Sequence, residues 1–355
     1  MAGAGERSAE AVPGGAPVKL VVWDLDDTIW EGTLLEGDSL RLRPGIADIV
    51  RTLDARGILQ SIASRNDPEA AAAKLREFGL HDYFLFPQIN WSSKSGSIEQ
   101  IIGRLGIGAD TVLFVDDQDF ERAEVGDRLP EVRALPPSCC DRLLDDPMLA
   151  ERFATAESGR RRLMYLEDQK REQDERAFEG PREEFLRSLD MRIEISPAGP
   201  EDLLRAEELI ARTNQLNSTG ITYSMAELEA LRRSADHKLI LVAFSDRFGD
   251  MGKIGLVLLK TTASRWTVKL FLMSCRVMSR NVGSVIINHI LAEARRAGRE
   301  LRAEFRNTGR NRPMLIAYKF AKFVEAERNG DHILFRHSLS DIPDPPAYVK
   351  LVVSR

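Results

Sequence analysis

The sequence predicts an α/β fold: a doubly wound parallel sheet, followed by a second domain of the α+β class. Three short apolar runs, at residues 18–23, 58–63 and 111–115, have the length and branching of strands buried on both faces. Segments that favour helix separate these runs, as in a sheet of parallel strands joined by crossover helices. The chain has 355 residues, 43% of them hydrophobic and 30% charged, which is enough for two separate cores.

The first domain is expected over residues 18–140, after a disordered tail over residues 1–17 that is rich in Ala, Gly and Pro. Strand and helix alternate along it. The expected elements are a strand before Asp24, a helix over 46–56, a strand before Ser64, a helix over 69–78 and a strand before Asp116, with Pro136 and Pro137 closing the domain.

Acidic residues gather where the first strand ends, in the stretch DLDDT. Asp24 and Asp26 are two apart, so in extended backbone both project to one side and can share a metal and a substrate. In open α/β sheets ligands bind where such strands end. An acidic turn after a core strand is the simpler interpretation, but it leaves the other strand ends unexplained.

Those other strand ends also carry reactive residue types. Ser64 follows the second strand, Asp116 and Asp117 follow the third, and Lys94 lies between them in the stretch NWSSKSGS. A carboxylate, a hydroxyl, a lysine and an acid pair, in this order, resemble the four motifs of the haloacid dehalogenase superfamily. The resemblance implies a phosphoryl-transfer enzyme with Mg²⁺ as its cofactor.

On this resemblance, Asp24 is the nucleophile that forms an aspartyl phosphate, and Asp26 is the general acid and base. The metal would bridge Asp24, the backbone carbonyl of Asp26, and Asp116. Asp117 and Glu121 would support the metal site without binding the metal themselves. The residues expected to bind phosphate or to orient its loop are Thr28, Ser64, Arg65, Asn66 and Lys94.

The spacing of the motifs leaves no room for a capping domain. About forty residues separate Asp24 from Ser64, and about thirty separate Ser64 from Lys94. A crossover helix and its loop need nearly all of the residues in each interval. A site without a cap stays open and can admit a group presented on a macromolecule. The alternative is a small substrate with a partner domain as the lid.

Residues 141–190 are strongly charged and favour helix, which is typical of a solvated connector, with a partner-docking face as the alternative. The second domain is expected over residues 191–355. Its order of elements resembles the GCN5-related acetyltransferase fold, in which a basic loop leads into a helix that binds the pyrophosphate of coenzyme A. Here the loop SCRVMSRNVGS does not meet that family's spacing from Arg276. A phosphopantetheine arm on a carrier protein is a shorter ligand for the same groove.

Both domains together resemble the FkbH-like family of polyketide assembly lines, through the phrases VVWDLDDTIWEG, SRND, NWSSKSGSI, FVDDQDFER, TNQLNSTGITYS, FGDMGKIG and LMSCRVMSRNVG. The resemblance implies a bifunctional glyceryl transferase/phosphatase. Such an enzyme takes 1,3-bisphosphoglycerate, a small phosphorylated three-carbon substrate, removes phosphate, and places the glyceryl group as a thioester on a phosphopantetheinylated acyl carrier protein. The alternative is a plain magnesium-dependent phosphohydrolase whose second domain only binds a partner.

Transfer through an enzyme thioester needs a reactive cysteine, and Cys275 is the best candidate because Arg276 and Arg280 lie close by and can favour the thiolate. These two arginines are also expected to bind phosphate or substrate. A small buried hydrophobe is the alternative role for Cys275. In the FkbH-like family a cysteine often precedes the serine at position 64, whereas this chain has Ala63.

Composition sets the outer bounds. The net charge of −5 gives no general attraction to nucleic acid or anionic membranes. No apolar stretch approaches a membrane span, and the first residues lack the apolar core of a signal peptide. Three cysteines, two of them adjacent, do not make a disulfide framework. A cytoplasmic location is therefore expected.

Overall fold

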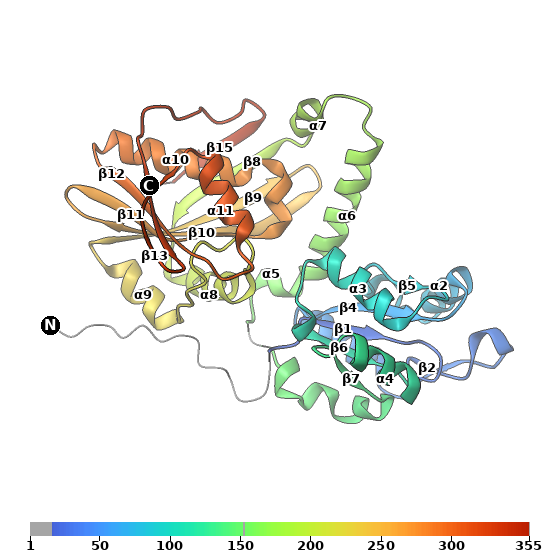
Figure 1. The fold of residues 1–355 in the computed structure, drawn as a ribbon. Helices are drawn as coiled ribbons and strands as arrows, with labels where there is room; N and C mark the ends of the chain where they lie inside the picture. The colour runs from blue at the N-terminus through green and yellow to red at the C-terminus, as the bar shows by residue number, and fades with distance from the viewer. Residues whose placement is uncertain (1–15, 152, 355) are drawn as a thin grey trace. The chain divides into compact units, whose positions relative to one another are not determined.

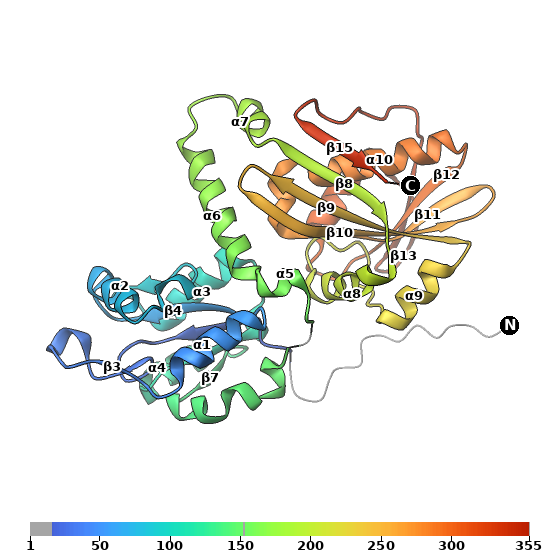
Figure 2. The ribbon, with the colours of Figure 1, turned by 180° about the vertical axis from the view of Figure 1, so that it is seen from behind.

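A computed structural model describes residues 16–151 and 153–354, so most of the expected tail lies outside the described residues. The chain divides into two compact units, one ending at Leu166 and the other beginning at Glu167. Figures 1 and 2 show both units as ribbons, and each is described here by itself.

The division between the units falls inside helix α6 (Arg161–Ala177). We had expected a separate connector over residues 141–190. Instead, residues 141–166 pack with the first unit and residues 167–190 with the second.

The first unit is built on a five-stranded parallel sheet in the order β5-β4-β1-β6-β7. The central strand β1 pairs with β4 on one side and β6 on the other, so the chain winds outward in both directions from β1. Such a reversal of strand order is the place where open α/β sheets bind ligands. The strands are β1 (Leu20–Trp23), β4 (Leu59–Ser64), β5 (Gln88–Ile89), β6 (Val112–Val115) and β7 (Arg133–Leu135).

Helices cover both faces of this sheet because both faces of its strands are apolar. Val21 and Trp23 of β1 pack in one core with α1 and α2, whereas Leu20 and Val22 pack in another with α3 and α4. Figure 1 shows α4 in front of the sheet, and Figure 2, from behind, shows α1 in front. The helices are α1 (Ile46–Ala55), α2 (Pro68–Glu77), α3 (Lys94–Leu105), α4 (Asp119–Arg128) and α5 (Ala156–Gly159).

Only short segments are inserted between the motifs, as the spacing predicted. Between β1 and α1 the chain forms the antiparallel pair β2 (Trp30–Glu31) and β3 (Arg41–Leu42), with a single 3-10 turn η1 (Leu34–Glu36). Between β4 and β5 it forms α2 and the turn η2 (His81–Tyr83). Further 3-10 segments are η3 (Ala109–Thr111), η4 (Pro137–Asp145) and η5 (Pro147–Leu149).

The second unit carries an eight-stranded mixed sheet in the order β13-β14-β12-β11-β10-β9-β8-β15. Strands β11 and β12 pair in parallel, as do β8 and β15, and the other neighbours are antiparallel. The strands are β8 (Met191–Pro197), β9 (His237–Asp246), β10 (Gly249–Thr261), β11 (Arg265–Met273), β12 (Glu300–Arg306), β13 (Val324–Asn329), β14 (His332–His337) and β15 (Val349–Val353).

Two helix pairs cover the faces of this second sheet: α10 and α11 pack in one core, and α8 and α9 in the other. The α+β class expected for this domain and the parallel sheet expected for the first are confirmed. The remaining elements are α7 (Arg182–Ser188), η6 (Pro200–Asp202), α8 (Leu203–Arg212), α9 (Met225–Arg233), η7 (Cys275–Arg280), α10 (Val282–Arg296) and α11 (Arg312–Phe320).

Candidate active site

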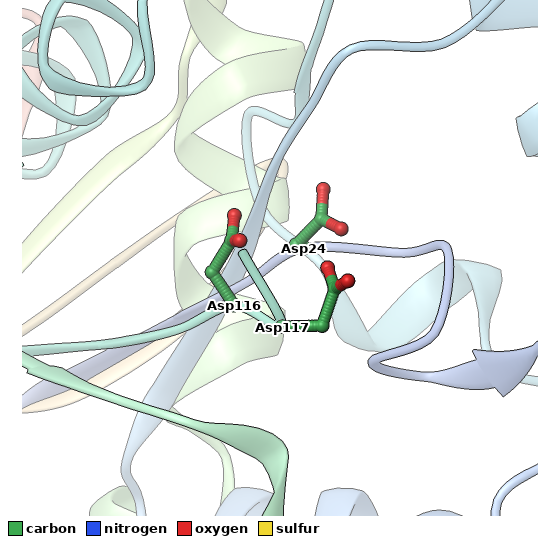
Figure 3. Close-up of side chains that lie close together, drawn as sticks. All are labelled: Asp24, Asp116 and Asp117. Atoms are coloured by element: carbon green, nitrogen blue, oxygen red, sulfur yellow. The ribbon is translucent and has the colours of Figure 1, made fainter. Parts of the chain in front are cut away.

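Three carboxylates meet where β1 and β6 end. Asp24 directly follows β1, and its backbone N–H donates to the Val115 carbonyl at the end of β6 (2.9 Å). Asp116 and Asp117 directly follow β6. One carboxylate oxygen from each aspartate lies within 4.8 Å of the others, and Figure 3 shows the three side chains together. Asp24 and Asp116 are buried, so their negative charge needs local compensation.

Lys94 supplies part of that compensation. It is the first residue of α3 and is 4% exposed. Its ammonium pairs with the Asp24 carboxylate, lies 2.9 Å from Asp116 Oδ2, and donates to the Ala63 carbonyl (2.9 Å). Burial works to lower the pKa of Lys94, but the negative charges of Asp24 and Asp116 prevail and the pKa is raised. Lys94 is therefore a permanent cation inside the acidic cluster.

One ammonium does not balance three carboxylates. Burial raises the pKa of Asp24 to about 7; the charge of Asp116 adds to this rise, while Lys94 opposes it. Burial also raises the pKa of Asp117, again with Asp116 adding to the rise. Because the unbalanced ligand atoms are all hard carboxylate oxygens held close together, this cluster fits a small divalent cation such as Mg²⁺.

Asp26 lies differently from what its spacing suggested. We expected Asp24 and Asp26 to share one side of an extended strand, but β1 ends at Trp23 and the Leu25 carbonyl accepts the N–H groups of Thr28, Ile29 and Trp30 in a turn. The acidic cluster therefore contains the Asp117 carboxylate, which we had expected only to support the site, and not that of Asp26. Metal binding through the Asp26 backbone carbonyl stays a prediction.

The Asp26 carboxylate accepts three hydrogen bonds. Its Oδ1 accepts from the Trp30 indole N–H (2.8 Å) and from the Leu34 backbone N–H (3.1 Å), and its Oδ2 accepts from the Asn66 side-chain amide (2.9 Å). We had expected Asn66 to bind phosphate, whereas here it orients Asp26. Thr28, in the same turn, is fully buried.

The remaining residues expected at the phosphate lie on the loops beside Asp24. Ser64 is the last residue of β4 and is buried. Arg65 follows it, donates to the Ser92 carbonyl (3.3 Å), and forms an ion pair with Glu121 at 3.0 Å. The Arg65 side chain is 41% exposed, whereas that of Glu121 is 3% exposed. Glu121 thus holds Arg65 in place, and the Arg65 guanidinium still faces solvent.

The structure changes the interpretation of Cys275. The residue begins η7 and is exposed. We expected nearby cations to favour its thiolate, but neighbouring protein atoms desolvate the sulfur and raise the pKa of the thiol, although Arg276 opposes this rise. The raised pKa leaves little thiolate at neutral pH.

The two arginines of this turn also differ from expectation. Arg280 is buried, donates to Asp168 Oδ1 (2.9 Å), and lies 5.7 Å from the centre of the Phe244 ring. Asp168 also accepts from Arg171, which in turn pairs with Asp246. A phosphate group would have to displace Asp168 to reach the Arg280 guanidinium. Arg276 is half-buried, and a role for it in binding substrate stays a prediction.

A segment of the chain itself occupies the gap between β11 and β12. These strands pair from Arg265 and Glu300 as far as Val268 and Ala303, and no further. Beyond that point, Ser218 donates its N–H to the Phe271 carbonyl (2.9 Å), and its own carbonyl accepts the Arg306 N–H (2.9 Å). The Ser218 backbone therefore links the two strands where they no longer pair with each other.

Sequence reasoning missed the indole of Trp30 and the carboxylate of Glu124, which accepts from Ser95. Trp30 lies four residues after Asp26, and a buried Trp requires a partner for its N–H, so the nearby acid was a usable signal. Glu124 contacts a residue 29 positions away, and nothing in the local sequence indicates that pairing.

Comparisons with known proteins bear on the first unit. The sequence model of a haloacid dehalogenase-like hydrolase matches residues 32–121. The first unit carries a haloacid dehalogenase-like hydrolase domain. Human magnesium-dependent phosphatase 1 is 29% identical over 119 residues, which cover 28% of this chain and 68% of that protein.

Solved structures resemble each unit separately. The N-terminal part of BF1531 from Bacteroides fragilis, which contains a phosphatase domain complexed with Mg, is 28% identical with a TM-score of 0.34; the match covers 38% of this chain and 40% of that one. Ard1 from Thermoplasma volcanium is 16% identical with a TM-score of 0.32, covering 41% of this chain and 96% of that one. The Escherichia coli ribosomal-protein-S18-alanine N-acetyltransferase is 15% identical with a TM-score of 0.33, covering 41% and 92%.

Within the part of the chain that the structure describes, no helix is both long and apolar enough to span a bilayer.

Proposed function

We propose that this enzyme is a Mg²⁺-dependent phosphatase and glyceryl transferase. It dephosphorylates 1,3-bisphosphoglycerate and loads the glyceryl group as a thioester on a phosphopantetheinylated acyl carrier protein of polyketide biosynthesis. The observation that carries the phosphatase part is the cluster of Asp24, Asp116 and Asp117 around Lys94. The transferase part rests on the FkbH-like phrases of the sequence.

The chain's own residues divide the phosphatase work between them. A carboxylate oxygen of Asp24 attacks phosphorus, the bond from phosphorus to the leaving oxygen breaks, and Asp26 gives that oxygen a proton. Asp26 then takes a proton from water, whose oxygen attacks the aspartyl phosphate, so that phosphate leaves and Asp24 is regenerated. Lys94 keeps the Asp24 carboxylate oriented throughout. When bound, Mg²⁺ held by the three aspartates supplies positive charge that offsets the phosphate oxygens.

In this proposal Arg65 holds a further anionic group of the substrate. Its guanidinium is partly exposed, while the buried Glu121 carboxylate holds it by an ion pair. A three-carbon bisphosphate carries a second phosphate that can use such a cation. Without a capping domain, the same opening can also admit a phosphoglyceryl group already attached to a carrier.

The acyl step needs no ATP because 1,3-bisphosphoglycerate is an acyl phosphate. A thiolate attacks the acyl carbon, the bond to the phosphate oxygen breaks, and a thioester and free phosphate form; hydrolysis of the remaining phosphate ester then leaves the glyceryl thioester. The raised pKa of Cys275 favours direct attack by the carrier's own thiol over an enzyme thioester.

The second candidate is a plain Mg²⁺-dependent phosphohydrolase whose second unit only binds a partner. One observation favours it: the raised pKa of the Cys275 thiol, which weakens the case for an enzyme thioester in the second unit. The acidic cluster of the first unit is the same for both candidate functions.

The deciding experiment incubates the enzyme with 1,3-bisphosphoglycerate, Mg²⁺ and a phosphopantetheinylated carrier, and then weighs the carrier by mass spectrometry. We expect a glyceryl adduct with wild-type enzyme. Hydrolysis of the phosphate ester should depend on Asp24, so the Asp24→Asn variant should give no glyceryl adduct free of phosphate. Phosphate release without any adduct on the cognate carrier would refute the transferase function and support the plain phosphohydrolase. Cys275→Ala should still load the carrier if the carrier thiol attacks directly.

A further inference from the structure

The position of Lys94 depends on the first turn of α3. A lysine side chain has four rotatable bonds, so contacts with Asp24 and Asp116 are held only if the backbone at residue 94 is fixed. The first N–H groups of a helix have no partner within the helix and need one from elsewhere. In α3, the Ser93 side chain accepts from the Gly96 N–H (3.2 Å), and the first turn contains no acidic residue of its own.

Glu124 supplies the missing acid from a different helix. On α4, its Oε1 accepts from the Ser95 hydroxyl (2.5 Å) and its Oε2 accepts from the Ser95 backbone N–H (3.1 Å). Ser95 is buried and directly follows Lys94. A carboxylate at a helix N-terminus is also favoured by the helix dipole. Both oxygens of Glu124 therefore hold the residue next to Lys94.

The same helix holds two other loops of the site. Arg122 donates to the backbone carbonyl of Asp116 (2.6 Å), and Glu121 pairs with Arg65. Because α4 contacts the loop after β4, the start of α3 and the loop after β6, it sets the spacing between Lys94 and the carboxylates that Lys94 must reach. Glu124 is the α4 residue that bonds to the first turn of α3.

We propose that Glu124 is a positioning residue for Lys94: its two hydrogen bonds to Ser95 place the lysine ammonium between Asp24 and Asp116. The expected loss of kcat rests on the proposed phosphatase function. The expected displacement of the Lys94 ammonium rests on the geometry alone. Glu124 itself touches neither the nucleophile nor the substrate.

The kinetic test compares Glu124→Ala with wild type in phosphate release from 1,3-bisphosphoglycerate with Mg²⁺. A reactive group misplaced by about 1 Å costs on the order of 100-fold in rate, so we expect kcat to fall about 10- to 100-fold. The loss should lie in kcat more than in KM, because Lys94 orients the nucleophile. Glu124→Gln keeps one acceptor oxygen and should be intermediate, as should Ser95→Ala, which keeps the backbone bond.

Asp127→Ala is the matched control, since it removes an exposed carboxylate from the same helix one turn on. It should retain wild-type kcat. A merely structural role for Glu124 would lower the melting temperature and the active fraction while leaving kcat per active site unchanged, and that result would overturn the proposal.

A crystal structure of Glu124→Ala tests the geometry without relying on activity. We expect the Lys94 ammonium to lose its joint contact with Asp24 and Asp116, while the Asp127→Ala structure keeps it. An unmoved Lys94 would overturn the inference even if the enzyme is an active phosphatase. A wild-type enzyme that releases no phosphate would instead refute the proposed function. In that case the position of Lys94 in the Glu124→Ala structure would still show whether Glu124 positions Lys94.

Discussion

Replacing Lys94 with methionine should destabilise the metal-free protein, because it leaves two buried carboxylates without their cation. The side chains involved are 5% exposed for Lys94, 7% for Asp24 and 1% for Asp116. Removing one partner of a buried ion pair typically costs about 3–5 kcal/mol. For a unit of this size each kcal/mol lowers the melting temperature by about 2–4 °C, so we expect a drop of roughly 6–20 °C.

The size of this effect should depend on pH and on Mg²⁺. With Lys94 present, the pKa of Asp24 is raised to about 7 against the opposing effect of the lysine, so without the lysine it rises further. Protonation of Asp24 then relieves part of the cost at low pH, and the loss of stability relative to wild type should grow as the pH rises above 7. A cation bound to the three aspartates should restore more stability to the variant than to wild type.

The assay is thermal or denaturant unfolding at pH 6 and pH 9, each with EDTA and with Mg²⁺. Lys74→Met is the matched control: Lys74 pairs with Glu77, whose side chain is 62% exposed, so its loss should change stability by less than about 1 kcal/mol. If Lys94→Met unfolds like that control at pH 9 in EDTA, Lys94 does not balance the acidic cluster and the electrostatic reasoning fails.

Three further predictions concern single contacts. Trp30→Phe removes the indole N–H that donates a hydrogen bond to Asp26, and it should lower kcat about tenfold. Trp91→Phe is the control, at a residue that is 69% exposed, and it should keep the wild-type kcat. Equal kcat values for the two variants would rule out this role for Trp30. In a Mg²⁺ titration of activity, Asp117→Asn should raise the Mg²⁺ concentration for half-maximal activity about 10- to 100-fold. The control Asp127→Asn should leave that concentration unchanged. If Asp117→Asn also leaves it unchanged, Asp117 is not part of the metal site. Alkylation of Cys275 by iodoacetamide, followed by peptide mass spectrometry, should be slower at pH 7.5 than that of a free thiol and should accelerate as the pH rises, since a raised pKa means less thiolate. Faster alkylation than that of a free thiol would contradict the raised pKa of Cys275.

The parts of the site that follow from strand ends could be predicted from sequence. Parallel strands bring their carboxyl ends to one edge of the sheet, so Asp24, Ser64 and Asp116 had to lie near one another once the strands before them were identified. Lys94 begins a helix, and only its place in the family motifs indicated that it would reach Asp24.

The parts set by turns and by distant packing could not be predicted in this way. The period-two argument for Asp26 failed because β1 ends at Trp23 and the following turn moves that carboxylate toward Trp30 and Asn66. Arg280 is paired with Asp168, a residue 112 positions away, and the local sequence does not indicate such a pairing. The strands β13, β14 and β15 are likewise hard to predict, because their apolar runs are short and mixed with charge.

The most direct test of the central claim is chemical trapping of the intermediate on Asp24. The enzyme is mixed with 1,3-bisphosphoglycerate and Mg²⁺, quenched during turnover, and reduced with borohydride, which converts an aspartyl phosphate to homoserine. Peptide mass spectrometry should find homoserine at position 24 and nowhere else, and no homoserine in Asp24→Asn. Homoserine at Asp26, Asp116 or Asp117, or turnover without any reducible intermediate, would contradict the assignment of Asp24 as the nucleophile.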